Sequence, residues 1–229
     1  MLFVGREKKK KEILCSLRKG INVFVRGSFG MGRTTLIKHL ANTQNDLRFI
    51  FVDFSKPPLY MCNTLLRELF PNRKFSRNYI KYKSGRFQLM THDLEDKRKH
   101  VIVLDNITRL TAPKLNMVRH LNWENRFFFI GIIESFLPKE EFFRLRSWLD
   151  PSVTVILQRL NKRNGIEFFQ RLSASRRFNW DERQIESLAA TAGGYPLRMI
   201  EIAARELEHD KEKHTMASLN DTSRWDLVT

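Results

Sequence analysis

Short, continuous apolar runs are the feature that most constrains how this chain can fold. The five runs are Ile21–Arg26, Phe49–Asp53, Val101–Asp105, Phe127–Ile133 and Val153–Leu157. Strands that are buried on both faces need continuous apolar residues, whereas strands with one solvated face alternate. Segments with helical spacing separate several of these runs. The order therefore predicts an α/β fold in which helices flank a parallel sheet.

Helical spacing also divides the chain into regions. In the first part it occurs at Lys8–Lys19, Thr34–Asn42 and Leu59–Phe70. After about residue 160 no strand is predicted, and three helices follow at Gly165–Ser173, Asp181–Thr191 and Pro196–Glu208. We therefore predict an α/β core over residues 1–160, a small all-helical lid over 161–208 and a polar C-terminal tail over 209–229.

Composition excludes several classes of protein. No apolar run approaches the roughly 18 residues that cross a bilayer, so we expect no membrane span. The two cysteines, Cys15 and Cys62, are too few for a disulfide framework or a zinc site, which favours a cytoplasmic protein. The 41 Lys and Arg against 25 Asp and Glu give a net charge of +16. This excess predicts a polyanionic partner, most simply nucleic acid; the alternatives are an anionic membrane surface or a charge that only aids solubility.

A glycine-rich segment connects the first predicted strand to the helix at Thr34–Asn42. It reads Gly27-Ser28-Phe29-Gly30-Met31-Gly32-Arg33-Thr34-Thr35 and matches the phosphate-binding pattern G-x-x-x-x-G-K-[ST] at every position but one. Glycines let successive backbone N–H groups face one anion, and the helix N-terminus adds positive charge. The alternative is a plain glycine turn before a helix. We predict that these nine residues bind a nucleotide, with ATP and Mg²⁺ as the cofactors.

Arg33 stands where that pattern has lysine. A lysine ammonium is compact and reaches between the β- and γ-phosphates, whereas a guanidinium is wider, planar and forked. Arg33 can neutralise phosphate, but we do not expect its wider side chain to adopt the pose of a lysine. We therefore expect nucleotide binding to survive and efficient hydrolysis to be impaired.

Asp105 and Asn106 follow the apolar part of the third predicted strand. Four apolar residues and then an acid are typical of the aspartate that faces Mg²⁺ in a Walker B motif, so Thr34 and Asp105 are the predicted metal ligands. Many such ATPases follow this aspartate with a glutamate that polarises the attacking water. Asn106 can hold a water but cannot accept its proton. Together Arg33 and Asn106 predict weak ATP hydrolysis at most.

With these motifs the chain resembles the AAA+ ATPases of the initiator-like branch over about residues 2–208. This branch contains replication-origin initiators and transposition regulators of the MuB, TnsC and TniB kind. Origin initiators normally carry a C-terminal winged-helix domain, which the polar residues after the lid are not expected to form. A core with a lid and no such domain is most similar to the transposition regulators.

The resemblance implies roles near the bound nucleotide. Phe3–Glu7, which includes Gly5 and Arg6, resembles the N-terminal segment that lies beside the adenine. Phe129–Ser135 is similar to the sensor-1 strand, with Glu134 or Ser135 at its polar tip, where family members usually have Asn, Thr or Ser. The alternative for Arg6 and Glu7 is an exposed charge pair.

The resemblance also implies two arginine sites. Arg144–Leu149 is similar to the segment that carries the arginine finger, so Arg144 or Arg146 would reach the nucleotide of a neighbouring subunit. Gly193–Arg198 resembles the start of the sensor-2 helix, which would place Arg198 near the γ-phosphate. The alternative is that all three arginines lie on a solvated surface and do not contact nucleotide.

A basic, acid-free stretch lies at Pro71–Met90. Its six cationic residues are Arg73, Lys74, Arg77, Lys81, Lys83 and Arg86. Four aromatic residues lie between them in the sequence or next to them: Phe75, Tyr79, Tyr82 and Phe87. Cations neutralise phosphates, and aromatic side chains pack on sugars or bases. We therefore predict that the six cations bind DNA. The alternative is a solvated basic helix with core aromatics, and Lys8–Lys11 is a second candidate.

The leading hypothesis is an ATP-binding AAA+ protein that assembles on double-stranded DNA. It would form a homo-oligomer, either a ring or a helical filament, and recruit a partner such as a transposase during DNA transposition. One alternative is a non-hydrolysing, nucleotide-bound protein scaffold. The other is a replication-initiator-like or helicase-loader-like ATPase.

Overall fold

The computed structural model describes residues 3–72, 82–94, 96–123, 125–134, 136–176, 178 and 180–208. The chain divides into two compact units. One is an α/β unit, Arg6–Gln158, and the other, here called the helical unit, comprises the described parts of Met1–Gly5 and Arg159–Thr229. Each unit has its own apolar cluster.

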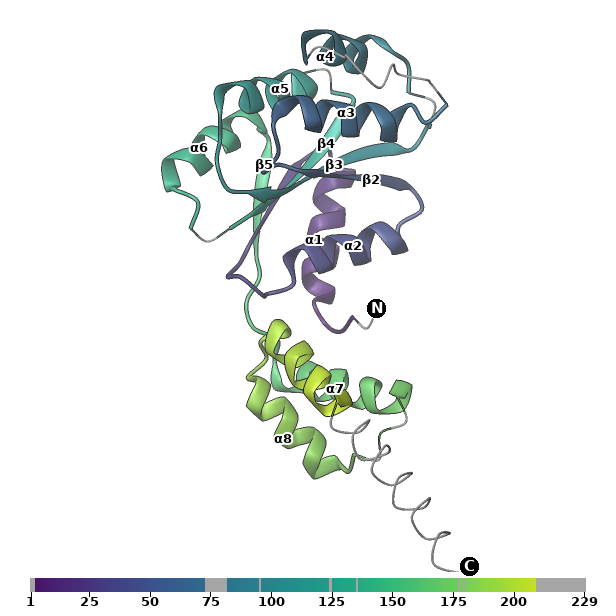
Figure 1. The fold of residues 1–229 in the computed structure, drawn as a ribbon, viewed down its shortest axis with the longest axis vertical. Coiled ribbons are helices and arrows are strands. Elements are labelled where there is room, and N and C mark those ends of the chain that lie inside the picture. Colours follow the sequence, from purple (N-terminus) through teal and green to yellow (C-terminus); the bar gives the residue numbers. More distant parts are fainter. Residues whose placement is uncertain are drawn as a thin grey trace, which may run out of the picture. The chain divides into compact units, whose positions relative to one another are not determined.

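The α/β unit contains a five-stranded parallel sheet, which confirms the predicted fold class (Figure 1). The strands are β1 (Asn22–Arg26), β2 (Leu47–Asp53), β3 (Lys99–Ile107), β4 (Phe127–Ile133) and β5 (Ser152–Ile156), arranged in the order β2-β3-β4-β1-β5. Every neighbouring pair is parallel, so all carboxyl ends meet at one edge. Buried residues follow one another in the inner strands β1, β3 and β4, which are covered on both faces, whereas the edge strands β2 and β5 are only partly buried.

Helices cover both faces of this sheet. On one face lie α1 (Glu7–Arg18) and α2 (Arg33–Thr43); on the other lie α3 (Pro58–Leu69), α5 (Ala112–Trp123) and α6 (Lys139–Trp148), with α4 (Tyr82–Thr91) against α3 (Figure 1). The second group encloses the main apolar cluster, which includes the fully buried Phe24, Phe54 and Phe129. A Cβ on Gly131 would lie 2.6 Å from the Phe24 ring, so glycine is needed there.

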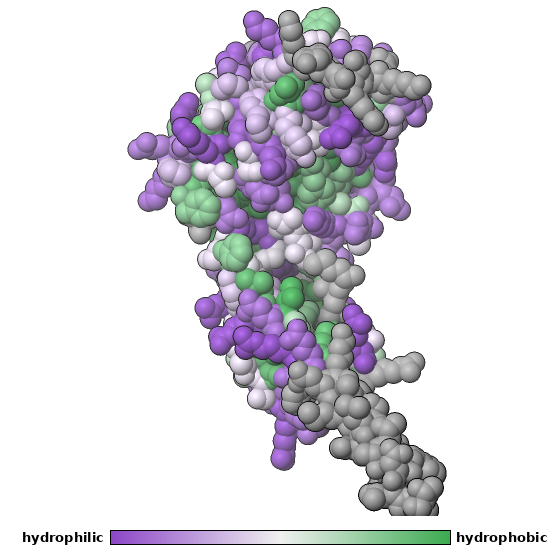
Figure 2. All heavy atoms as spheres, viewed as in Figure 1, coloured by the Kyte–Doolittle hydropathy of each residue, from purple (hydrophilic) through white to green (hydrophobic). Residues whose placement is uncertain are grey.

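Hydrophilic side chains cover most of the visible face of the α/β unit, with smaller hydrophobic areas between them (Figure 2). None of the helices within the described ranges is both long and apolar enough for a membrane crossing. Cys15 is exposed and Cys62 is buried, and both are free thiols.

The helical unit is built from α7 (Lys162–Arg176), α8 (Glu182–Ala192) and a helix over 196–208. Its cluster includes Val4, Phe169 and Met199, and the Phe169 ring lies 6.2 Å from the Trp180 ring. Gly194, with φ of 69°, follows α8; a Cβ there would lie 2.0 Å from the Leu160 carbonyl oxygen. Close packing against Leu160 therefore requires glycine at position 194, independently of any role of Gly193–Arg198 in nucleotide binding.

Candidate functional site

The glycine-rich loop follows β1 and leads directly into α2. Gly30 and Gly32 have φ values of 77° and 75°, in the left-handed region that side chains rarely adopt, and Gly32 is the residue before the helix. The loop thereby turns sharply enough to present backbone N–H groups at a helix N-terminus. A Cβ on Gly27 would lie 3.2 Å from the Leu157 carbonyl oxygen, so the loop also lies close to the chain that follows β5.

Thr34 and Asp105 form a direct contact. The Thr34 hydroxyl donates a hydrogen bond to the Asp105 carboxylate at 3.2 Å, although 71 residues separate them. Both side chains are half-buried. A hydroxyl and a carboxylate oxygen in one place, within reach of solvent, are a suitable donor set for Mg²⁺. These two residues would hold the metal that balances the charge of a bound polyphosphate.

A β-bulge aims the Asp105 side chain. The pairing of β3 with β4 shifts register between Leu104 and Ile107, and Asn106 has φ of 56°. The Asn106 backbone N–H donates to Asp105 at 2.9 Å. A bulge at a strand end re-aims the residues that it contains. The same bulge leaves the Asn106 side chain exposed at the edge of the sheet.

Arg33 pairs with Glu134, the residue that follows β4. The guanidinium donates one hydrogen bond to the Ile133 carbonyl and a second to the Glu134 carboxylate, forming an ion pair. The Arg33 side chain is 6% exposed and that of Glu134 is 18% exposed. The residue at the lysine position of the phosphate-binding pattern thus already has an anionic partner.

Asp53, which ends β2, is a site residue that our sequence analysis missed. Its carboxylate accepts hydrogen bonds from the Ser55 backbone and hydroxyl at 3.0 and 2.7 Å and from the Asn106 amide at 3.3 Å. Burial acts to raise the pKa of the Asp53 carboxyl, but these hydrogen bonds outweigh it and hold the pKa below its ordinary value. Asp53 therefore brings a charged carboxylate beside Asn106.

The buried Lys114 of α5 is a second missed residue near this edge. Its ammonium donates to the Phe54 carbonyl at 2.5 Å and to the Ser55 carbonyl at 3.4 Å. Burial lowers the pKa of Lys114, and the charge of Asp53 opposes this effect. Lys114 thus fixes the loop after β2.

Arg6 braces the glycine-rich loop. Its guanidinium donates to the Met31 carbonyl at 2.8 Å and to the Gln158 carbonyl at 3.1 Å, and burial lowers its pKa. The preceding residue, Gly5, belongs to the helical unit and has φ of 69°. Arg6 thus contacts backbone carbonyls at the loop while Glu7 pairs with Lys10, which differs from the exposed Arg6–Glu7 pair that the sequence left open.

Three other predicted arginines are exposed. Arg144 and Arg146 lie on α6 on either side of the buried Leu145, and within the described residues neither is in an ion pair. Arg198 lies on the helix over 196–208, next to the buried Met199.

The predicted DNA-binding stretch is described only in part. Arg73, Lys74, Arg77 and Lys81 lie outside the described residues. Lys83 is exposed on α4, and the Arg86 guanidinium lies 5.9 Å from the centre of the Tyr82 ring. Phe87 is 65% exposed, so this aromatic residue is not part of the core. Of the second basic candidate, Lys9 and Lys10 pair with Glu12 and Glu7.

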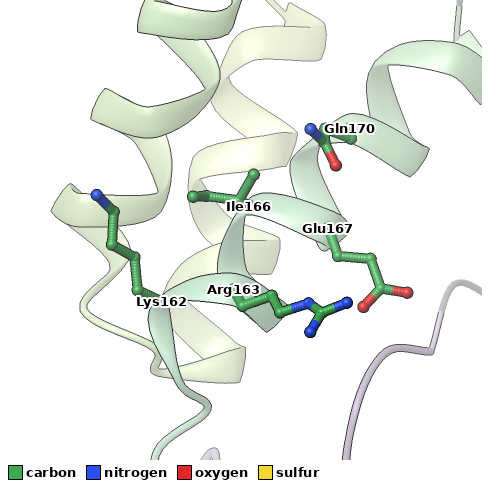
Figure 3. A pocket seen from close by; sticks show the side chains of 5 residues that line it. All are labelled: Lys162, Arg163, Ile166, Glu167 and Gln170. Atoms are coloured by element: carbon green, nitrogen blue, oxygen red, sulfur yellow. The ribbon is translucent and has the colours of Figure 1, made fainter.

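The helical unit has a hollow of about 710 Å³ along α7 that the sequence did not indicate. Lys162, Arg163, Ile166, Glu167 and Gln170 line it, and Arg163 and Glu167 project to the same side (Figure 3). Glu167 also forms an ion pair with Arg171 at 2.5 Å.

The parallel sheet and the glycine-rich loop between β1 and α2 define a P-loop protein with the AAA+ fold. A family model described as an AAA domain matches residues 18–139, which is more than half of the chain. The chain belongs to this AAA domain family.

Comparison with solved structures gives the same fold. The Aeropyrum pernix ORC1 protein, solved in complex with DNA, matches 92% of this chain with a TM-score of 0.67 at 15% identity. The Aeropyrum pernix ORC2 protein, solved in ADPNP and ADP complexes, matches 91% with a TM-score of 0.63 at 16% identity. A Thermotoga maritima RuvB variant matches 89% with a TM-score of 0.60 at 18% identity.

The matched region covers 62% of each of these three proteins, so the chain spans less than two thirds of their length. No curated protein matched in sequence. The expected AAA+ fold is thus confirmed, while the closer likeness to transposition regulators stays a prediction.

Proposed function

We propose that this chain binds ATP with Mg²⁺ and that the bound nucleotide controls its assembly on double-stranded DNA. The contact between Thr34 and Asp105 is the observation that carries the nucleotide site, because it joins a metal-binding hydroxyl and a carboxylate beside a loop shaped to hold phosphate. Similarity to a protein solved with ADPNP and ADP supports the same assignment. Isothermal titration of the protein with ATP, in the presence and absence of Mg²⁺, tests it. Equal affinities in both conditions would contradict the metal site.

The hydrolysis that we propose is weak or absent. Asn106 cannot accept a proton from water, and Arg33 is engaged by Glu134. Bound ATP would then act mainly as a ligand that stabilises one assembly state. The same features support a non-hydrolysing scaffold, which differs in having no affinity for DNA.

DNA binding is proposed through the basic stretch that includes α4. Lys83 and Phe87 are exposed there, and the chain carries a net charge of +16. The similar ORC1 protein was solved in complex with DNA, which supports testing duplex DNA first. Each phosphate contact contributes nearly one unit to the dependence of log affinity on log salt concentration.

The double variant Lys83→Ala/Arg86→Ala tests this surface by fluorescence anisotropy with labelled duplexes. We expect affinity to fall about equally for all sequences and the salt slope to flatten by up to about two units. The double variant Lys97→Ala/Arg183→Ala removes one Lys and one Arg from exposed positions outside both basic candidates and is the matched control. Equal losses in the two variants would assign the effect to net charge alone and exclude a specific role for α4.

Assembly is proposed to use the exposed arginines of α6. Arg144 or Arg146 would contact nucleotide on a neighbouring copy in a ring or helical filament, and Arg198 would contact nucleotide within its own subunit. The resemblance to transposition regulators makes a transposase the partner to test first, with a replication or helicase-loading factor as the second.

Sedimentation with a slowly hydrolysed ATP analogue and duplex DNA tests the assembly. We expect Arg144→Ala/Arg146→Ala to remain monomeric while still binding nucleotide. Lys97→Ala/Arg183→Ala, which removes equal charge at exposed positions outside α6, should assemble normally. Assembly of the arginine variant at the unmodified protein's concentration would rule out the α6 contact.

A further inference from the structure

The cation of the glycine-rich loop is neutralised before any phosphate arrives. Arg33 begins α2 immediately after Gly32, at the position whose charge the phosphate-binding pattern directs at the β- and γ-phosphates. Its guanidinium is buried and forms an ion pair with the Glu134 carboxylate. The pair has a net charge of zero, so this position offers a polyphosphate little net attraction.

Sheet order brings Glu134 to this place. β4 lies directly beside β1, and Arg26 pairs with Ile133 at the ends of these two strands. The loop begins one residue after Arg26 and Glu134 follows Ile133, so both leave the sheet at adjacent points of one edge. The second hydrogen bond of Arg33, to the Ile133 carbonyl, anchors the guanidinium at that edge.

The two classes of nucleotide differ in what they require of this pair. A diphosphate brings only its β-phosphate near the pair, so it places less negative charge beside Glu134 than a triphosphate does. A γ-phosphate needs a cation beside it, and if it takes Arg33, the Glu134 carboxylate loses its partner and stands beside a multiply charged anion. Like charges that are close together in a partly buried site repel strongly, and an unpaired buried charge is costly.

We propose that Glu134 makes this nucleotide site selective for a nucleoside diphosphate over the corresponding triphosphate. The pair with Arg33 is the resting state, and a triphosphate is held tightly only when Glu134 has moved away from Arg33. This inference rests on the proposed nucleotide binding and adds the identity of the preferred ligand to it. A partner or a neighbouring copy that displaces Glu134 would convert the site to triphosphate binding.

The test compares ADP and ATP affinities, measured by competition against a fluorescent ADP analogue with Mg²⁺ present. In the unmodified protein we expect ADP to bind at least about tenfold more tightly than ATP. Glu134→Gln keeps the size and a hydrogen-bond acceptor for Arg33 but removes the charge. We expect it to raise ATP affinity more than ADP affinity, so that the ratio falls about tenfold.

Glu140→Gln is the matched control, because it removes the same charge from an exposed position on α6. The control should keep the ratio of the unmodified protein. A triphosphate that binds the unmodified protein as tightly as the diphosphate overturns the inference, and this measurement needs no variant to fold. An unchanged ratio in Glu134→Gln also overturns it while leaving nucleotide binding in place. If neither nucleotide binds, both this inference and the proposed function fail.

Discussion

Two neighbouring residues of the glycine-rich loop contact acids that leave neighbouring strands, yet the two contacts differ in kind. Thr34 donates a single hydrogen bond to Asp105 of β3, and both side chains are half-buried. Arg33 is buried and forms an ion pair with the half-buried Glu134 after β4. The first contact is weak and near solvent, so a metal ion can replace it. The second contact is a strong ion pair, so a phosphate group must compete with Glu134 for the Arg33 guanidinium.

The Thr34–Asp105 contact therefore governs metal binding, whereas the Arg33–Glu134 pair governs binding of a γ-phosphate. In a parallel sheet all strand ends face one edge, and loops at this edge are where α/β proteins bind ligands. The identity of each strand-end residue then decides which part of the ligand is favoured. Asp105, near the end of β3, supplies negative charge for Mg²⁺, whereas Glu134, after β4, neutralises the positive charge of Arg33.

The largest expected effect concerns catalysis. The swap Asp53→Asn with Asn106→Asp keeps the net charge and the contact between the two positions but moves the carboxylate to β3, beside Asp105. Because a positioned general base contributes about 10²–10⁴ in rate, we expect phosphate release to rise by about that factor. Asp is chosen because Asn106 has φ of 56°, which Asp tolerates better than Glu.

Phosphate release under saturating duplex DNA measures this effect. Adding Asp105→Ala to the swap should return the rate to background. A rate of several per second in the unmodified protein, within the range of about 1–100 s⁻¹ typical of kinases, would show that another group activates the water.

The next largest effect concerns stability and compares the two contacts directly. Glu134→Ala leaves Arg33 buried with only the Ile133 carbonyl as an acceptor. Loss of one partner of a buried ion pair costs about 3 kcal/mol, so the free energy of unfolding should fall by about that amount. Asp105→Ala removes a half-exposed contact and should cost less than about 1 kcal/mol. Urea unfolding measures both, and equal losses would refute the distinction between the contacts.

The third effect concerns Mg²⁺. Asp105→Ala removes one of the two oxygen donors that we assign to the metal, and we expect the Mg²⁺-dependent gain in ATP affinity to fall about 10- to 100-fold. Asp46→Ala removes the same charge from an exposed residue and serves as the control. Titrations with and without Mg²⁺ measure the gain, which should persist in the control. A gain that survives in Asp105→Ala would place the metal elsewhere.

The sequence predicted those parts of the molecule that local patterns encode. The apolar runs gave the five strands, and the glycine spacing gave the loop between β1 and α2. The helix α5 was not predicted, although Leu115, Val118 and Leu121 have helical spacing, and the burial of its Lys114 was missed as well. That lysine is buried only because it reaches carbonyl groups after β2, about sixty residues earlier in the sequence. Contacts of this kind have no local signal.

The same reasoning applies to the candidate site. The pairing of Arg33 with Glu134 joins residues 101 positions apart and depends on β4 lying beside β1, an order that the sequence does not state. Asp53 was missed despite a usable signal. Asp53 follows the apolar residues Phe49–Val52, just as Asp105 follows the apolar residues Val101–Leu104. The pattern of four apolar residues and then an acid would therefore have identified Asp53 as well.

The smallest expected effect tests Asp53 as a third strand-end acid, through pH. The carboxyl is held below its ordinary pKa of 3.8, partly by the Ser55 hydroxyl. A depressed pKa in the folded state contributes stability that is present above pH 3.8 and is lost as pH falls through the folded value. Ser55→Ala removes one hydrogen bond to a partly exposed group and keeps the backbone bond, so we expect a loss of about 0.5 kcal/mol at pH 7.

That loss should shrink toward zero as the pH is lowered below about 4, because protonated Asp53 no longer benefits from the hydroxyl. Urea unfolding of the unmodified protein and Ser55→Ala across this range measures the difference. Ser147→Ala removes a hydroxyl that bonds only to the Phe143 carbonyl in α6, so its effect should not vary with pH. If the Ser55→Ala loss is equally independent of pH, Ser55 does not act through the Asp53 charge.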